Sequence, residues 1–200
     1  MKRMQGKIWI GAACFAAAMI TQHSQAGEGG GFRFPIGLTY VQGAYDVTDK
    51  LKENFRISDD FVWPVGLSFS PYYEFNWGLG VGVDVGPAAI IDIQRFGASD
   101  NLNYIVPVGA HVRYTLLRDK DFSPYARAGF RYPIVGGDFL KDGSPGAFGA
   151  VGVEFLSTKR VSLAVELGYD TSTVKVIRGP LGGEKNATYG GLTASLMVVF

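Results

Sequence analysis

The chain has 200 residues, with 28 glycines, an aromatic share of 14%, and 19 lysines and arginines against 18 aspartates and glutamates. A nucleic-acid-binding domain normally carries an excess of positive charge, so the near balance argues against nucleic acid as the main partner. The hydrophobic fraction of 47% excludes a disordered chain. The length suits one folded domain.

The first 26 residues have the layout of a secretory signal peptide. A basic start, an uncharged apolar stretch and a cleavage site with small residues follow one another: Lys2, Arg3 and Lys7, then residues 8–20, then Ser24 and Ala26 before Gly27. The apolar stretch is shorter than the ~20 residues that a membrane-spanning helix needs. We therefore predict a cleaved signal-peptide helix at 1–26 and one exported domain at 27–200. The single cysteine, Cys14, falls in the removed part, so the mature chain forms no disulfide.

The exported part alternates between apolar and small or polar residues with a period of two, which is typical of strands with two different faces. In residues 77–85, for example, Trp77, Leu79 and Val81 share one face, and glycines occupy the other. This pattern predicts eight strands, at residues 33–46, 61–73, 77–85, 104–116, 122–134, 146–157, 161–169 and 192–200.

The connections between these strands alternate between long and short. They fall near residues 47–60, 74–76, 93–102, 118–121, 135–145, 158–160 and 175–187. Antiparallel barrels of bacterial outer membranes have this asymmetry, with tight periplasmic turns and longer outer loops. The sequence therefore predicts an all-β fold, an eight-stranded antiparallel up-and-down transmembrane β-barrel, with both mature termini in the periplasm.

Aromatic residues are expected in two girdles at the ends of the lipid-facing band. One set falls near the short turns and the other near the long loops: Phe34, Trp77, Phe122, Phe155 and Phe200, then Trp63, Tyr104, Tyr132 and Tyr169. The outward face is accordingly predicted to be aliphatic, and the glycines are predicted to line a crowded lumen, since eight strands enclose only enough room for side chains.

With this pattern the chain resembles the small eight-stranded outer-membrane barrels, the superfamily of the OmpA-type transmembrane domain and the OmpX- and opacity-like proteins. The resemblance covers residues 33–200, and its most specific element is the last strand. Alternate apolar positions there end on a terminal phenylalanine: Leu192, Ala194, Leu196, Val198 and Phe200. The resemblance implies that this strand engages the barrel-assembly machinery. No periplasmic peptidoglycan-binding domain follows it in this sequence.

Charged residues on the predicted inner face carry the functional hypotheses. Counting from the short turns places Arg113, Arg127, Glu154 and Glu166 at similar heights on consecutive strands, so that they form a lumen charge belt. Further polar residues are predicted to face the lumen: Asp84, His111, Arg131 and Asp170. Two cations and two anions in one narrow belt can neutralise one another, as buried charges must. Such a belt is either a plug that fills the lumen or a gate for a small pore, and we favour the plug.

Other classes of function fit the sequence less well. A lipid-modifying hydrolase needs a serine and an acid beside a histidine, but His111 is the only histidine of the exported part and no nucleophile spacing is recognisable. One histidine and no cysteine disfavour a transition-metal site, and no cofactor is predicted. A soluble lipocalin-like carrier would point its apolar residues inward, whereas the inner face here is glycine-rich and charged.

We therefore expect a non-enzymatic, integral protein of the bacterial outer membrane, with a structural or surface-interaction role and a lumen filled by side chains. A narrow porin-like channel for small solutes is the alternative, and a lipid-modifying enzyme is a more distant one. The expected partners are outer-membrane lipid and lipopolysaccharide, with the assembly machinery at the last strand. The charged connection at 47–60 is expected to be a solvated outer loop.

Overall fold

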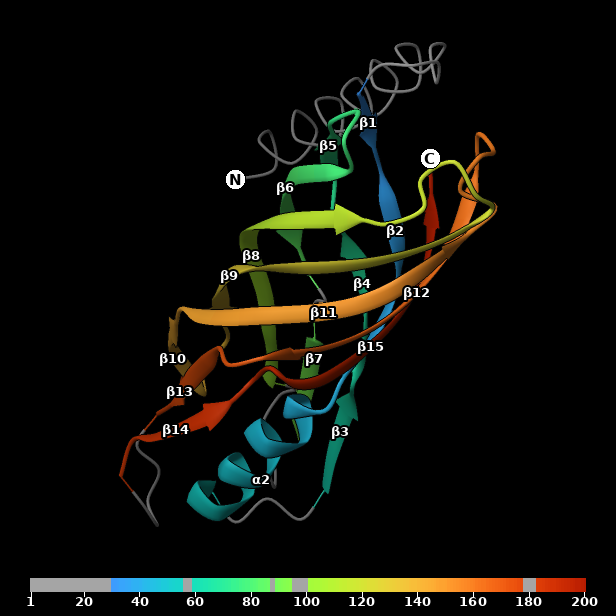
Figure 1. Ribbon diagram of the computed structural model, residues 1–200. Coiled ribbons are helices and arrows are strands. Elements are labelled where there is room, and N and C mark those ends of the chain that lie inside the picture. Colours follow the sequence, from blue (N-terminus) through green and yellow to red (C-terminus); the bar gives the residue numbers. More distant parts are fainter. Residues whose placement is uncertain (1–29, 56–58, 87–88, 95–100, 178–182) are drawn as a thin grey trace, which may run out of the picture.

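Eight antiparallel strands close into a barrel (Figure 1). The structure is a computed structural model that describes residues 30–55, 59–86, 89–94, 101–177 and 183–200. The strands of the ring are β2 (Pro35–Val41), β4 (Val65–Phe69), β6 (Leu79–Val85), β8 (Asn101–Thr115), β9 (Phe122–Gly136), β11 (Gly146–Phe155), β12 (Ser162–Asp170) and β15 (Gly191–Val199). Each pairs with the next, and β15 pairs with β2, which closes the ring. The predicted all-β, eight-stranded antiparallel barrel is confirmed. The predicted signal-peptide helix, with its cleavage site between Ala26 and Gly27, lies outside the described residues.

Four short strands extend the walls of the barrel at its two ends. At the end nearer the C-terminus, β1 (Gly31–Arg33) pairs with β5 (Tyr72–Glu74), which in turn pairs with β6. At the other end, β3 (Asp59–Trp63) pairs with β7 (Ala89–Gln94), and β7 pairs with β8. Pro64 separates β3 from β4, because a proline has no N–H to donate to a ladder; its carbonyl still accepts from Val41 N at 2.8 Å.

The two faces of the wall differ as the alternation predicts. Apolar side chains point outward and are exposed, Phe130 to 71% and Leu67 to 68%, whereas most inward side chains are polar and buried. This arrangement is the reverse of a soluble protein, and it suits a wall whose solvent is hydrocarbon. Closure of the ring also lets the strands satisfy one another's backbone groups, which a bilayer requires. Exposed aromatic side chains lie at both ends of the wall, as the two predicted girdles require. They include Trp77, Phe122 and Phe155 at one end and Trp63, Tyr104, Tyr132 and Tyr169 at the other.

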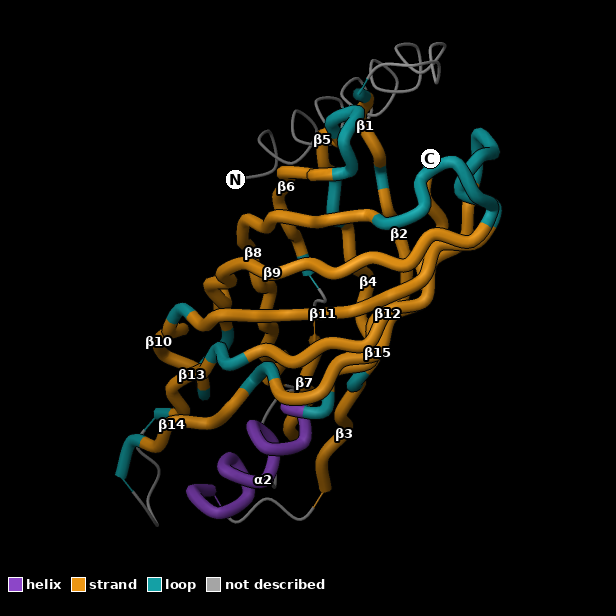
Figure 2. Tube along the Cα trace, viewed as in Figure 1, coloured by secondary structure: helices purple, strands orange, loops and turns teal. Residues whose placement is uncertain are grey.

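The long connections form a folded cap, which corrects the expectation of solvated loops. The segment predicted as a charged loop at 47–60 instead contains most of a helix, α2 (Gly43–Phe55). The strand predicted at 33–46 is shorter than expected, because β2 ends at Val41 and the helix begins two residues later. Two of the other long connections contribute a three-stranded sheet in the order β10 (Leu140–Ser144), β13 (Thr173–Val176) and β14 (Lys185–Thr188). Figure 2 shows the helix and this small sheet at the end of the barrel opposite β1.

The cap has an apolar core of its own. Its buried residues come from α2, from the small sheet and from the adjoining strand ends: Val41, Ala44, Val47, Leu51, Ile105, Phe139, Leu140, Val174, Val176, Ala187 and Tyr189. On α2, Ala44, Val47 and Leu51 recur at spacings of three and four, so they share one face of the helix. Charged neighbours hide this period in the sequence, which is the physical reason why the loop prediction was wrong.

Polar contacts attach α2 to the small sheet. Thr188 N donates to Asp46 Oδ2 at 2.7 Å, and Asn54 Nδ2 donates to the carbonyls of Ile177 and Gly183 at 3.2 Å each. Lys185 Nζ donates to Glu53 Oε2 at 2.6 Å, and this contact holds the pKa of the exposed Glu53 carboxyl below its usual value. The helix is therefore fixed over the mouth of the barrel. Among the described residues, no helix has the length and apolarity needed to cross a membrane.

Candidate functional site

A network of buried charges fills the barrel lumen, and its members come from five adjoining strands, β6, β8, β9, β11 and β12. Alternation turns every second side chain of these strands inward. The register then sets their heights: Arg113 of β8 stands directly beside Arg127 of β9, and Glu154 and Glu166 follow on β11 and β12. All four members of the predicted belt are buried.

Arg113 and Glu154 form the first ion pair of the network. Arg113 Nη2 donates to Glu154 Oε2 at 2.6 Å, and Arg113 Nε donates to Thr115 Oγ1 at 3.2 Å. The guanidinium also lies between two aromatic rings, with its carbon 3.6 Å from the ring centre of Tyr125 and 4.7 Å from that of Tyr72. Cation–π contacts of this kind strengthen when they are shielded from water. Arg113 is thus held by charge, hydrogen bonds and packing together.

Two glycines make room for these rings. A side-chain carbon on Gly152 would lie 2.5 Å from the Tyr125 ring, and one on Gly80 would lie 2.9 Å from the Tyr72 ring. Gly152 stands beside Tyr125 in the register of β11 and β9, and Gly80 stands beside Arg113 in that of β6 and β8. Inward glycines of the alternating pattern therefore provide the space in which Arg113 is clamped.

Arg127 connects two carboxylates at the centre of the network. Its Nη2 donates to Glu166 Oε1 at 2.6 Å, and its Nη1 donates to Asp84 Oδ1 at 2.8 Å. Tyr125 OH also donates to Glu166 Oε2, at 3.2 Å. Charge-assisted hydrogen bonds as short as the two that Arg127 donates are among the strong ones in proteins. The Arg113 and Arg127 pairs are therefore joined through Tyr125.

Asp84 is the junction for the remaining residues. It accepts a hydrogen bond from Ser70 Oγ at 2.7 Å, and His111 Nδ1 lies 2.9 Å from its Oδ2. Arg131 Nη2 lies 3.6 Å from Asp84, and Arg131 Nη1 donates to Asp170 at 3.4 Å. The Arg131 guanidinium is also 3.9 Å from the centre of the Phe148 ring. All four further lumen residues named from the sequence, Asp84, His111, Arg131 and Asp170, are thus parts of one connected set.

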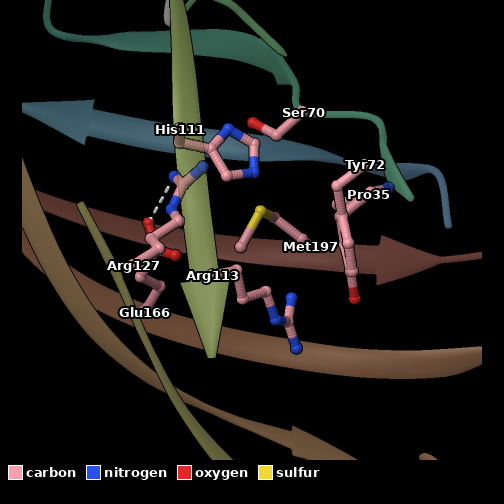
Figure 3. A pocket seen from close by; sticks show the side chains of 8 residues that line it. All are labelled: Pro35, Ser70, Tyr72, His111, Arg113, Arg127, Glu166 and Met197. Atoms are coloured by element: carbon pink, nitrogen blue, oxygen red, sulfur yellow. Dashed lines mark hydrogen bonds and ion pairs between the residues drawn. The ribbon is translucent and has the colours of Figure 1, made fainter. Parts of the chain in front are cut away.

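The opposite wall of the lumen carries short hydroxyl side chains. Thr39 Oγ1 lies 2.9 Å from Ser68 Oγ and 2.8 Å from Ser195 Oγ, which links β2 to β4 and β15. A cavity of about 10 Å³ lies between Pro35 of β2, Met197 of β15 and the charges, which is room for about one water molecule. Figure 3 shows the eight side chains that surround it, including the Arg127–Glu166 pair. At this point of the lumen, the side chains leave little more room than one water molecule needs.

Glu74 closes the end of the lumen near the short turns, and the sequence pattern did not single it out. It is buried, and its carboxylate lies 3.7 Å from Arg33 Nε and 3.5 Å from Arg118 Nε. Glu74 was assigned to a turn, although it belongs to β5 and continues the inward alternation of Ser70 and Tyr72. Tyr72 and Tyr125 were also missed, since an inward tyrosine has no distinctive spacing.

The contacts of His111 do not form a hydrolytic relay. Such a relay needs the serine on the imidazole and the acid behind it. Here the Ser70 hydroxyl and His111 Nδ1 both bind Asp84, so the acid lies between them. Within the part of the chain that the structure describes, no group of three or more histidine, cysteine, aspartate or glutamate side chains is placed to hold a metal ion.

The two tyrosines that flank Arg113 give a matched test of the network. Tyr72 OH has no hydrogen-bond partner among the described residues, whereas Tyr125 OH donates to the charged Glu166. Tyr125→Phe is expected to lower the free energy of unfolding by ~1.5–3 kcal/mol, and Tyr72→Phe by less than ~0.5 kcal/mol. Urea unfolding of both variants in the same lipid measures this difference. Equal losses would show that the Tyr125–Glu166 contact contributes nothing.

Comparisons with known proteins agree with the architecture. Residues 10–200 match the family described as outer membrane protein beta-barrel domain. Among solved structures, the outer membrane protein OprG from Pseudomonas aeruginosa is similar at 11% identity, with a TM-score of 0.55 over 86% of this chain and 94% of that one. Neisserial surface protein A (NspA) is similar at 17% identity, with a TM-score of 0.46 over 86% of this chain and 97% of that one. No curated protein sequence matches the chain.

Proposed function

Because the chain belongs to the outer membrane protein β-barrel family, and is thus an integral barrel of the bacterial outer membrane, we propose that it serves there as a closed, structural barrel that presents its folded cap at the cell surface. In this proposal the barrel has no enzymatic activity and needs no cofactor. Its lumen does not conduct solutes in the resting state.

The observation that carries the proposal is the direct pairing of the lumen charges around a cavity of about 10 Å³. A water-filled channel would keep such charges apart and hydrated, as in wider barrels. Here Arg113 and Arg127 each contact a carboxylate at 2.6 Å. Passage of a solute would require at least these two ion pairs to separate.

The lengths of the connections support one orientation of the barrel in the membrane. We place the short turns and both mature termini in the periplasm, after removal of residues 1–26, and the cap outside. The assembly machinery is the proposed partner of the last strand, on which Leu192, Ala194, Leu196, Val198 and Phe200 share the outward face. Outer-membrane lipid and lipopolysaccharide are the proposed surroundings of the wall.

Fractionation followed by bilayer recording tests this proposal. We expect to find the protein in the outer-membrane fraction, and we expect it to migrate differently on gels before and after boiling. In planar bilayers, it is expected to give no stable current steps. A protein in the soluble fraction without heat-dependent mobility would contradict the membrane assignment. Stable current steps from a correctly folded barrel would instead support the alternative, a narrow channel for small solutes.

A further inference from the structure

Arg131 is the most loosely held of the three arginines in the lumen charge network. Arg113 and Arg127 each contact a carboxylate at 2.6 Å. The shortest carboxylate contact of Arg131 is 3.4 Å, to Asp170 Oδ2, and its Nη2 lies 3.6 Å from Asp84 Oδ1. Its Nε is buried and has no hydrogen-bond partner among the described residues. One guanidinium is thus shared between two carboxylates and is held closely by neither.

Asp170 connects this guanidinium to the cap. It is the last residue of β12, and its Oδ1 accepts a hydrogen bond from Ser172 N at 2.7 Å. Ser172 O in turn accepts from Tyr189 N at 3.1 Å and from Gly190 N at 3.3 Å, where the chain returns from β14. Ser172 and Tyr189 therefore form the base of the β13–β14 hairpin, whose buried side chains belong to the cap core. The Asp170 carboxylate holds this base on the lumen side.

Asp84 connects the same guanidinium to the centre of the network. Its two oxygens have three closer partners: Ser70 Oγ at 2.7 Å, Arg127 Nη1 at 2.8 Å and His111 Nδ1 at 2.9 Å. Asp84 and Arg131 are both buried, so water screens their charges little. Because a guanidinium that approaches one carboxylate leaves the other, Asp84 and Asp170 compete for Arg131.

We propose that Arg131 is a latch between the cap and the lumen charge network. Contact with Asp170 fixes the base of the hairpin, whereas contact with Asp84 leaves the hairpin free to lift. The charge of Asp84, a residue of the barrel wall, therefore sets how readily the cap opens. By linkage the effect is reciprocal, so lifting of the hairpin moves Arg131 toward Asp84. The two ion pairs at 2.6 Å keep their contacts in both positions, and the lumen stays closed.

Hydrogen exchange at the base of the hairpin measures the latch. The full-length barrel is reconstituted in lipid nanodiscs, and mass spectrometry follows the amides of residues 171–176 and 185–190. Asp170→Asn and Arg131→Met are each expected to speed this exchange about tenfold, since each removes a charged contact that resists local opening. Asp84→Asn is expected to slow it about threefold, because Arg131 is then left with Asp170 as its charged partner.

Glu154→Gln is the matched control and is expected to leave this exchange unchanged. It removes the charge of another carboxylate of the same network, whose contacts are with Arg113 and Ser162. The response to Asp84→Asn separates a latch from an ordinary ion pair between Arg131 and Asp170, which would not respond to it. Unchanged or faster exchange in Asp84→Asn would overturn the proposal.

The double variant Arg131→Met with Asp170→Asn is the second arm, and it decides the matter if Asp84→Asn does not fold. It is expected to exchange within about threefold of the wild type, since removal of both charges leaves neither one buried without a partner. Single effects that simply multiply would show that the two residues are not coupled, and would also overturn the proposal. Heat-dependent gel mobility of each variant shows that the barrel has folded, so a failed latch is distinguishable from a failed membrane assignment.

Discussion

Glu154→Ala is expected to lower the free energy of unfolding by about 3–5 kcal/mol, the cost of leaving one member of a buried ion pair without its partner. The Arg113 guanidinium would remain clamped between Tyr72 and Tyr125 with no carboxylate within bonding distance on β11. Ser162, which donates to the other oxygen of Glu154, would lose its acceptor as well. The measurement is urea unfolding of the barrel in lipid, followed by the difference in gel mobility between folded and unfolded protein.

Two further variants separate the charge from the packing. Glu154→Gln keeps a hydrogen-bond acceptor near Arg113 and is expected to cost less than Glu154→Ala. Replacing both partners, with Arg113→Met and Glu154→Leu, is expected to recover most of the lost stability, because apolar side chains of similar volume often replace a buried pair without loss. If Glu154→Ala changed neither the stability nor the current through planar bilayers, the belt would have no role as a plug.

Leu51→Asp is expected to unfold the cap while the barrel stays intact. Leu51 is 0% exposed in the apolar core between α2 and the small sheet. Truncating such a core side chain costs ~2–5 kcal/mol, and a buried carboxylate without a partner costs more. The ring of eight strands has its own ladders, none of which includes α2. Proteolysis of whole cells should therefore cut the cap, whereas the heat-dependent gel mobility should persist.

The control for this experiment is Asp49→Ala, at an exposed position of the same helix, which should leave the cap resistant to protease. The same pair of variants shows which part seals the lumen. If the charge network is the plug, Leu51→Asp alone leaves the bilayer current unchanged, whereas Glu154→Ala raises it with or without Leu51→Asp. A current step from Leu51→Asp alone would assign the seal to the cap instead.

Local alternation was enough to predict the inner face of the barrel. Arg113, Arg127, Glu154 and Glu166 were identified from strand parity and from their distance to the short turns, because a strand turns every second side chain to the same side. The identity of the ion pairs was beyond that reasoning. Arg113 contacts Glu154, 41 residues away, and Arg127 contacts both Glu166 and Asp84. Such pairings depend on the register of strands that are distant in sequence.

By itself, then, the sequence determined the ring of eight antiparallel strands, its apolar outside and its charged inside, since these follow from a period of two read one residue at a time. Only the tertiary structure decided the cap. Val47 and Leu51 share an apolar core with Phe139, Val174 and Ala187, which lie in two other connections, β9–β11 and β12–β15. The apolar positions of each connection are too few to predict a core. They form one only when the closed ring brings these three connections together over its mouth.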